Sequence, residues 1–151
     1  MFFNDDGTIR KVIPTLRGVG LVESNSEIQI DRYSAISPQG ITVSFLDEAN
    51  PYLGWKASFK EAKSWVQFNE VDFGRGAEKS VQVRAKASGK GALEIHLDKQ
   101  DGPLVGRVEL RPSNEWKVAS VRAKNIPAGV HNLVVTQTAG EGVEVDWVSF
   151  K

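Results

Sequence analysis

The sequence predicts an all-β protein, an antiparallel β-sandwich of jelly-roll type, on two observations. Many short segments alternate apolar and polar residues with a period of two, which is typical of half-buried strands. Turn sequences such as SGKGA, KQDGP and NIPAG separate these segments and leave almost no room for crossover helices. Many short strands joined by Gly- and Pro-containing turns are typical of a sandwich.

We expect about nine strands, with boundaries accurate to ~2–4 residues. In order, they are IQIDRY (28–33), ITVSF (41–45), SWVQFNEVDF (64–73), VQVRAK (81–86), ALEIHLD (92–98), GRVEL (106–110), WKVASVRA (116–123), VHNLVVT (130–136) and VEVDWVSF (143–150). Val81, Val83 and Ala85 share one side of their strand, so we expect them in the core. Only residues 58–65, SFKEAKSW, have room for a helical turn.

The length of the chain suits one domain with an ordinary core. Residues 21–151 are expected to form the sandwich. Residues 1–20 have a different pattern and are expected to form a lead-in segment, in which DDG offers a turn for a small hairpin.

Composition excludes several classes of function. Lys+Arg and Asp+Glu both number 19, for a formal net charge of +0, which argues against a binder of nucleic acid or of anionic membranes. No apolar run is long enough to span a membrane, and the opening residues lack the apolar core of a signal peptide. Because there is no cysteine, disulfides, thiol catalysis and thiolate metal sites are excluded.

Catalytic motifs are absent as well. The sequence contains no phosphate-binding loop, no dinucleotide fingerprint and no nucleophile elbow, and His96 and His131 stand alone, without zinc-site spacing. Carboxylates are plentiful, but nothing local marks a pair placed for glycoside hydrolysis. We therefore expect this chain not to be an enzyme.

The four tryptophans divide into two kinds. Trp65 and Trp147 lie inside strand-like runs, whereas Trp55 and Trp116 lie beside the loop-like runs NPYLGW and RPSNEW. A tryptophan on a loop keeps a flat apolar face near water, which suits a sugar ring. A structural role is also open for each: Trp116 as a cap on the core, and Trp55 packed beneath the segment that follows it.

Two pairs of oxygen-bearing side chains have strand spacing. Gln29 and Asp31 are two residues apart, as are Glu144 and Asp146 near the other end of the chain. Because the first and last strands of a sandwich often neighbour each other, these side chains together could bind calcium, which takes ~6–8 oxygen ligands. From the spacing alone, ordinary outward-facing polar residues remain the better interpretation.

A series of blocks over about residues 28–150 resembles family 6 of the carbohydrate-binding modules. The blocks are IQIDRYSAIS, LGW, SWVQFNEVDFG, GALEIHLDKQDGPLVGRVEL, EWKV, IPAGVHNLVV and VEVDWVSF, in the order that this family has. The lead-in FNDDGTIRKVIPTLRGVG is similar to the join between a family 43 glycoside hydrolase domain and such a module. The resemblance implies a β-sandwich that forms the C-terminal part of a larger polysaccharide-degrading enzyme.

The resemblance also implies a structural calcium ion near the chain ends. Its ligands would be Gln29, Asp31 and Asp146 together with backbone oxygens. Gln29 stands where the family usually has glutamate. Because an amide oxygen carries no charge, we expect weaker calcium binding.

The family's sugar site at the loop end uses two aromatic rings and an asparagine. Trp116 matches one aromatic position, and Trp55 and Phe59 compete for the other: Trp55 through its Gly-Trp pair, Phe59 through its spacing from Trp65. Glu144 occupies the position of the asparagine, and a carboxylate accepts hydrogen bonds from hydroxyls but cannot donate them. Some members of the family bind sugar on the concave sheet face instead.

The implied function is that of a noncatalytic carbohydrate-binding module. It would target the enzyme to a plant-cell-wall glycan, such as xylan or an arabinose-bearing polymer. Its partners would be a polysaccharide or oligosaccharide and the upstream glycoside hydrolase domain, and the full-length protein would be secreted, periplasmic or at the cell surface. Trp65 and Trp147 recur in the family's strand blocks and are expected in the core. The alternative is a sandwich that braces the catalytic domain without binding sugar, which Glu144 and the insert near 56–63 favour.

Overall fold

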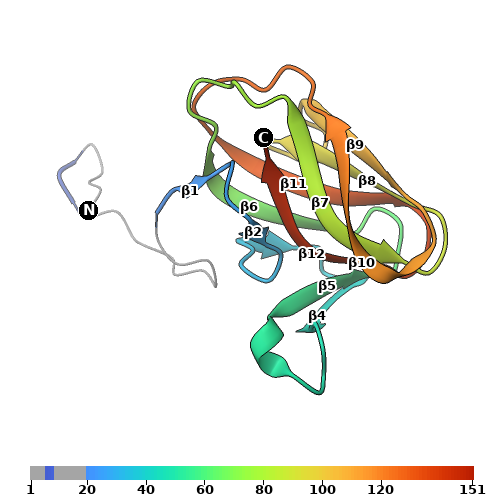
Figure 1. The fold of residues 1–151 in the computed structure, drawn as a ribbon. Helices are drawn as coiled ribbons and strands as arrows, with labels where there is room; N and C mark the ends of the chain where they lie inside the picture. The colour runs from blue at the N-terminus through green and yellow to red at the C-terminus, as the bar shows by residue number, and fades with distance from the viewer. Residues whose placement is uncertain (1–5, 9–19) are drawn as a thin grey trace.

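Two six-stranded sheets packed face to face make up the structure (Figure 1). It is a computed structural model that describes residues 6–8 and 20–151. The predicted fold class, an all-β sandwich, is confirmed. The hairpin expected in the lead-in lies outside the described residues, apart from residues 6–8.

The first sheet contains the long strands β6, β11, β8 and β9. In spatial order its strands are β1 (Val22–Glu23), β6 (Trp65–Asp72), β11 (Val130–Ala139), β8 (Gly91–Leu97) and β9 (Leu104–Leu110), and β3 (Ala35–Ile36) also pairs with β6. All of these pairings are antiparallel except that of β1 with β6.

The second sheet is centred on the C-terminal strand. In spatial order its strands are β10 (Ser113–Arg122), β7 (Ser80–Ala87), β12 (Val143–Phe150), β5 (Trp55–Phe59) and β4 (Ile41–Phe45), and β2 (Ile28–Gln29) also pairs with β12. All of these pairings are antiparallel. The expected neighbourhood of the strand that begins at Ile28 and the last strand is therefore found, as the pairing of β2 with β12.

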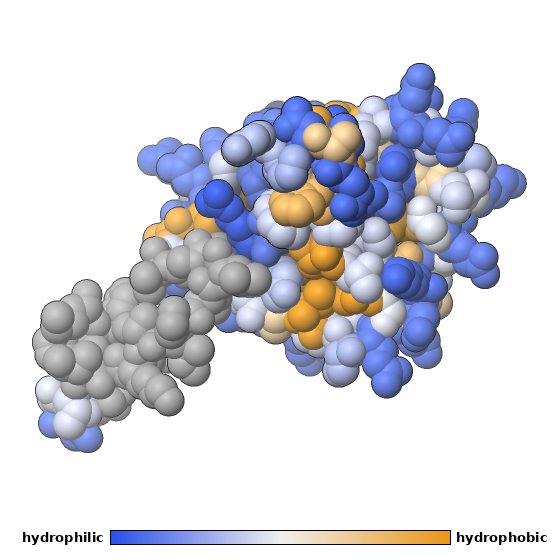
Figure 2. Space-filling model, turned by 90° about the horizontal axis from the view of Figure 1, so that it is seen from below, coloured by the Kyte–Doolittle hydropathy of each residue, from blue (hydrophilic) through white to orange (hydrophobic). Residues whose placement is uncertain are grey.

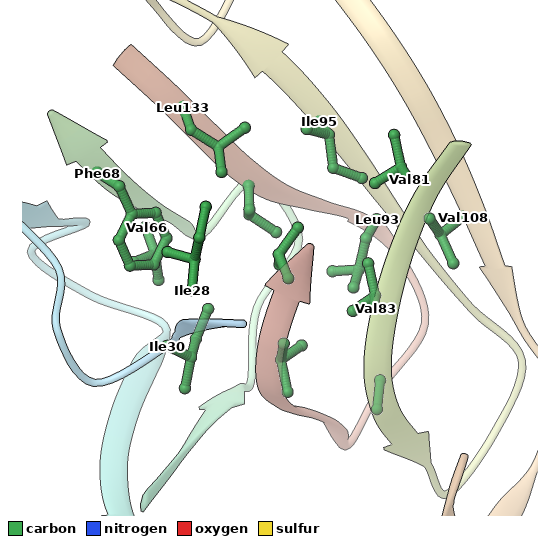
Figure 3. Close-up of a cluster of buried hydrophobic side chains, with 14 of the residues drawn as sticks. Ile28, Ile30, Val66, Phe68, Val81, Val83, Leu93, Ile95, Val108 and Leu133 are labelled. Carbon is green, nitrogen blue, oxygen red and sulfur yellow. The ribbon is translucent and has the colours of Figure 1, made fainter. Parts of the chain in front are cut away.

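The core lies between the sheets and follows the alternation of the sequence. Val81, Val83 and Ala85 of β7 are at most 2% exposed, and the residues between them lie on the outer face of the second sheet. Figure 3 shows Val81 and Val83 beside apolar residues of the first sheet, such as Leu93 and Ile95. Removal of this apolar area from water is the main force that holds the sheets together.

Two expectations about individual elements need correction. Residues 58–65 contain no helical turn, because β5 runs to Phe59 and a short turn then leads into β6. Among the described residues the helical element is a single 3₁₀ turn, Pro51–Leu53, and strands number twelve rather than nine. None of the helices in the described part of the chain has the length and hydropathy of a membrane-spanning segment.

The β4–β5 hairpin extends away from the body of the sandwich (Figure 1). Its register pairs Ile41 with Phe59 at the inner end and Phe45 with Trp55 at the outer end. Phe59 is fully buried, whereas Trp55 is 39% exposed. Two residues on the same face of β5 thus have different surroundings, because only the inner end of the hairpin is covered by the other sheet.

Candidate functional site

Trp116 lies on the outer face of the second sheet. It belongs to β10, in a segment where the pairing with β7 shifts between Ser113 and Lys117. Its half-buried ring lies over two cations of β7, with Arg84 Cζ 5.4 Å and Lys86 Nζ 5.2 Å from the ring centroid. These distances are within the range of cation–π attraction.

Glu144 lies on the same outer face, one strand further along. Its cross-strand neighbours are Ser58 of β5 and Lys86 of β7. Lys56 Nζ is 2.9 Å from Glu144 Oε1, and Lys86 Nζ is 2.8 Å from Oε2. The set Lys56, Arg84, Lys86, Trp116 and Glu144 is called the Trp116 face below.

The two lysines lower the pKa of Glu144. Burial alone would raise the pKa of Glu144, but hydrogen bonds and charges from Lys86 and Lys56 outweigh burial and hold it below its ordinary value. Both carboxylate oxygens are therefore engaged by ammonium groups. Lysine ammonium groups donate hydrogen bonds, which a carboxylate cannot do.

Neither expected partner of Trp116 lies on the Trp116 face. Trp55 alternates with Lys56, so its side chain is on the opposite face of β5, where it stacks on Phe45 with ring centroids 4.2 Å apart. Phe59 is 0% exposed. The expectation that Phe59 stacks on a sugar is therefore corrected, because no face of its ring reaches solvent.

Trp147 is the aromatic residue that shares the outer face with Trp116. It is the cross-strand neighbour of Arg84, so its side chain is on the same side of the sheet as Arg84, and it is half-buried. Trp65 is also half-buried, on the side of β6 opposite the buried Val66 and Phe68. The expectation that both tryptophans belong to the core is therefore wrong.

The three residues expected to bind calcium are brought together where β2 meets β12. Gln29 pairs with Trp147, and the amide of Ile30 donates to the carbonyl oxygen of Asp146 at 2.9 Å. Asp31 follows Ile30 directly in the chain. Asp146 sits at a shift in the β7–β12 register, which separates it from the regular alternation of the strand.

Asp146 is a buried carboxylate with several charged neighbours. It is 4% exposed and pairs with Arg84. Burial raises the pKa of Asp146, and the negative charges of Glu27 and Asp31 raise it further. Arg84 lowers this pKa but does not outweigh them, so the pKa lies above its ordinary value. Two further carboxylates, Glu27 and Asp31, thus act on Asp146 in addition to its partner Arg84. No group of three or more His, Cys, Asp or Glu within the described ranges is placed to hold a metal, so further ligands would have to be amide and backbone oxygens.

Comparison with known families decides the assignment. The model of "Carbohydrate binding module (family 6)" matches residues 42–151, which is most of the chain. The chain belongs to family 6 of the carbohydrate-binding modules. It is therefore a noncatalytic binding module by family, and the resemblance found in its sequence blocks is confirmed.

Three relatives place the module among known proteins. An arabinoxylan arabinofuranohydrolase of Paenibacillus polymyxa is 23% identical over 144 residues, which are 91% of this chain and 22% of that protein. A family 6 module of Clostridium stercorarium, solved with cellobiose, has a TM-score of 0.77 and 21% identity and covers 87% of this chain and 97% of its own. A family 43 arabinoxylan arabinofuranohydrolase of Bacillus subtilis, solved with cellotetraose, has a TM-score of 0.76 and 21% identity, covering 99% of this chain and 32% of its own. At these identities the structural likeness establishes the shared fold, and the chain spans about a fifth of its Paenibacillus relative.

Calcium occurs in a more distant structural neighbour. A family 36 module in complex with calcium and xylotriose has a TM-score of 0.60 and 12% identity to this chain, covering 83% of it and 99% of its own. The ion is thus compatible with this sandwich fold, and its place in the present module is a matter of proposal.

Sequence reasoning missed the residues that surround Trp116 and Glu144. Lys56 and Lys86 both contact Glu144, and Arg84 contacts both Trp116 and Asp146. Alternation in VQVRAK did place Arg84 and Lys86 on the polar side of their strand. The order of the strands in the sheet, which puts β7 between β10 and β12, was the missing information.

Proposed function

We propose that this module binds a plant-cell-wall glycan, xylan or an arabinose-bearing polymer, and holds an attached family 43 glycoside hydrolase at its substrate. Two relatives named as arabinoxylan arabinofuranohydrolases support this choice of glycan, since both are longer proteins that contain a region similar to this chain. The full-length protein would then act outside the cytoplasm, secreted, periplasmic or on the cell surface, where such polymers occur.

The observation that carries the proposal is the arrangement of the Trp116 face. A half-buried indole lies beside a carboxylate whose oxygens are held by Lys56 and Lys86 at 2.9 and 2.8 Å. A sugar ring offers apolar C–H faces and hydroxyls that both donate and accept hydrogen bonds. An aromatic ring with a few convergent polar groups is the combination that such ligands require.

Each side chain has a distinct role in this proposal. Trp116 stacks on the ring, Glu144 accepts hydrogen bonds from hydroxyls, and the two lysines donate to ring or hydroxyl oxygens. To admit a hydroxyl, one of the lysines has to move from Glu144. We therefore expect modest affinity, because part of the binding energy is used to replace an existing ion pair.

Calorimetric titration with xylo-oligosaccharides and arabinoxylan tests the proposal. Trp116→Ala is expected to weaken binding by up to roughly tenfold, the loss that stacking energies of ~0.5–1.5 kcal/mol imply. Trp65→Ala is a matched control, since Trp65 is also half-buried on an outer face but belongs to the first sheet. Equal affinity of Trp116→Ala and wild type would overturn the assignment of this face.

The alternative function, a structural sandwich without sugar binding, has one observation in its favour. The ion pairs of Glu144 already connect β5, β12 and β7, so the Trp116 face is internally satisfied without a ligand. Absence of binding to any glycan at millimolar concentration would establish this alternative. Release of sugar from chromogenic glycosides by the chain alone would contradict its noncatalytic role.

We also propose a structural calcium ion at the junction of β2 and β12. Asp31 and Asp146 would supply carboxylate oxygens and Gln29 an amide oxygen, and the ion would join the first and last strands of the sandwich. Buried Asp146 and the adjacent carboxylates support this proposal, whereas the existing contact of Asp146 with Arg84 makes weak affinity the expectation.

Thermal unfolding with and without a chelator tests the ion. Calcium that binds only the folded protein adds about 2.7 kcal/mol at 100 times its Kd, so chelation is expected to lower the Tm and added calcium to restore it. Asp31→Asn should abolish the response to calcium, and it disturbs the contact between Asp146 and Arg84 less than a change at either of them. An identical Tm in chelator and in calcium would rule the ion out.

A further inference from the structure

Strand β4 (Ile41–Phe45) forms a free edge of the second sheet. It pairs with β5, and no other strand in the described ranges pairs with it. The hairpin carries this strand away from the body of the sandwich (Figure 1). Figure 2 looks onto this end of the molecule and shows apolar side chains gathered near its centre within a hydrophilic surround. The side of the β4 backbone that faces away from β5 is called the β4 edge below.

Hydrogen bonds at both ends of the hairpin fix the phase of its ladder. At the inner end, the amide of Lys60 donates to the carbonyl oxygen of Gly40 at 2.7 Å. At the outer end, the amide of Leu46 donates to the carbonyl oxygen of Gly54 at 2.9 Å. The register between these two pairs has no shift. The even-numbered residues of β4 therefore face β5 throughout.

The backbone groups at the β4 edge belong to the odd-numbered residues. In an antiparallel ladder, residues that bond to the neighbouring strand alternate with residues that do not. Thr42 and Ser44 thus bond to β5, and the N–H and C=O groups of Ile41, Val43 and Phe45 point to the β4 edge. No ladder within the described part of the chain uses these groups. The edge consequently presents a row of donors and acceptors to a further strand.

The β4 edge lacks the features by which proteins protect a free edge. Such features are charged side chains, proline, register irregularities and very short strands. β10, at the opposite edge of the same sheet, has Lys117, Arg122 and a register shift, and β1, in the first sheet, is two residues long. β4 has the sequence ITVSF, which is uncharged, regular in register and rich in β-branched residues. An unprotected edge of this kind is a template for strand addition.

The sequence of β4 is suited to pair with itself in antiparallel orientation. With Val43 opposite Val43 of a second copy, Ile41 lies opposite Phe45 of that copy, and each such pair can exchange two N–H···O bonds. β-branched and aromatic side chains are favourable cross-strand neighbours. Asp47, just beyond the strand, then faces the uncharged Gln39. Parallel pairing would instead bring the two Asp47 side chains together, so charge favours the antiparallel arrangement.

A hollow beside the start of β4 provides a second complementary feature. It has a volume of about 350 Å³ and is lined by residues 37–39 and 61–65, among them Pro38 and Trp65. Tyr52 and Leu53, on the turn between β4 and β5, are 98% and 59% exposed. Antiparallel pairing lays this turn of one copy against the start of β4 in the other. Contact with the hollow would there remove apolar area from water.

We propose that the β4 edge pairs with the β4 edge of a second copy and joins the second sheets of two modules into one continuous sheet. An antiparallel pair of this kind has its two-fold axis perpendicular to the sheet, so the outer faces of both copies lie on the same side. The dimer thus presents two Trp116 faces to one polysaccharide. This consequence rests on the proposed function, whereas the pairing itself does not.

Sedimentation equilibrium of the chain without sugar tests the pairing. One short strand and one turn from each copy bury less area than a standard interface, so the dimer is expected to be weak. The mean mass should rise from 16.6 kDa at about 10 µM toward twice that value at about 1 mM. A mass that stays at 16.6 kDa over this range would overturn the proposal.

Two substitutions in β4 test the register. Thr42 is exposed, and across the two-fold axis the lysines introduced by Thr42→Lys lie diagonally, within reach of each other. Their repulsion should weaken dimerisation at least about tenfold. Val43→Pro should do the same, because it removes the central N–H of the β4 edge without removing a bond to β5. Thermal unfolding should show that both variants remain folded.

A control and a rescue separate the β4 edge from a general effect of charge. Ser120→Lys makes the same change on an exposed residue at the opposite edge of the sheet and should sediment like the wild type. A mixture of Thr42→Lys with Thr42→Glu should regain a mass that neither variant reaches alone. If Thr42→Lys and Val43→Pro dimerise as well as the wild type, another surface is used and the proposal is overturned.

Retention on arabinoxylan tests the shared presentation of the two Trp116 faces. At concentrations where the dimer forms, the wild type should be retained at least about threefold more strongly than Thr42→Lys, with equal affinity for xylotriose. Equal retention of the two proteins would overturn the shared presentation. A dimer that binds no glycan would refute the proposed function and leave the pairing of the β4 edges intact.

Discussion

The Trp116 face and the outer end of the β4–β5 hairpin, residues 46–55, called the hairpin tip below, both carry aromatic residues, but the surroundings of these residues differ. The ring of Trp116 lies over Arg84 and Lys86, within about 5.5 Å of both. The ion pairs around it are formed by lysine and glutamate side chains that are each less than 30% exposed. Tyr52 is 98% exposed, and its segment has no basic residue. A ligand at the face would therefore have to replace existing partners, whereas Tyr52 at the tip is already open to solvent.

This difference follows from how far each strand is covered. On the face, four adjacent strands place their outward side chains side by side, so each charge finds a partner. At the tip, β4 and β5 have run beyond the first sheet, and the side chains on their inward-facing side pack against each other, as Trp55 does on Phe45. Phe59 and Trp55 both lie on the inward-facing side of β5, yet Phe59 is buried and Trp55 is exposed.

Replacement of Phe59 by alanine should have the largest effect on stability. Truncation of a fully buried phenylalanine in a packed core lowers the free energy of unfolding by ~3–5 kcal/mol, because apolar burial is lost and a cavity remains. Urea unfolding of Phe59→Ala should show this loss, and Trp55→Ala, which removes a partly exposed ring, should lose only about 1 kcal/mol. Equal losses for the two variants would contradict the difference between the two ends of β5.

Glu144→Gln tests the charge network of the Trp116 face and should have a middle-sized effect. Both lysines lose an ionised partner, so the free energy of unfolding should fall by about 1–2 kcal/mol at low salt, less than for a fully buried pair. The loss should shrink in 1 M NaCl, since salt screens the interaction. Glu48→Gln at the exposed tip is the matched control and should change stability by under ~0.5 kcal/mol. A loss that does not depend on salt would argue against an ionic origin.

The sequence predicted the sandwich because alternation along the strands reflects burial directly. Val81, Val83 and Ala85 were expected inside and are buried. One local feature broke the alternation argument. The register shift around Asp146 in β12 changes which residues face outward, and Trp147 consequently shares a face with Arg84. A shift of this kind depends on the neighbouring strands and leaves no mark in a single sequence.

The candidate site was predicted in part, for a related reason. Trp116 and Glu144 do lie on one face, linked through Lys86, but Trp55 and Phe59 do not. Along β5, Trp55 alternates with the residues that neighbour Glu144. This alternation places Trp55 and Glu144 on opposite faces only when the pairing of β5 with β12 is known. That pairing joins residues almost ninety positions apart, and the family resemblance supplied spacing rather than register.

The smallest expected effect concerns the order of the hairpin tip. Asp47→Ala removes the side-chain oxygen that accepts the amide of Ala49, and the loss of such a local hydrogen bond should lower stability by about 0.5–1 kcal/mol. Asp47→Asn keeps an oxygen acceptor and removes only the charge, so it should retain the stability of the wild type. Hydrogen exchange of the Ala49 amide, followed by NMR, should quicken in the alanine variant and not in the asparagine variant. Equal exchange rates in the two variants would mean that the Asx turn does not hold the tip, and that its aromatic side chains are ordered by the stacking of Trp55 on Phe45 instead.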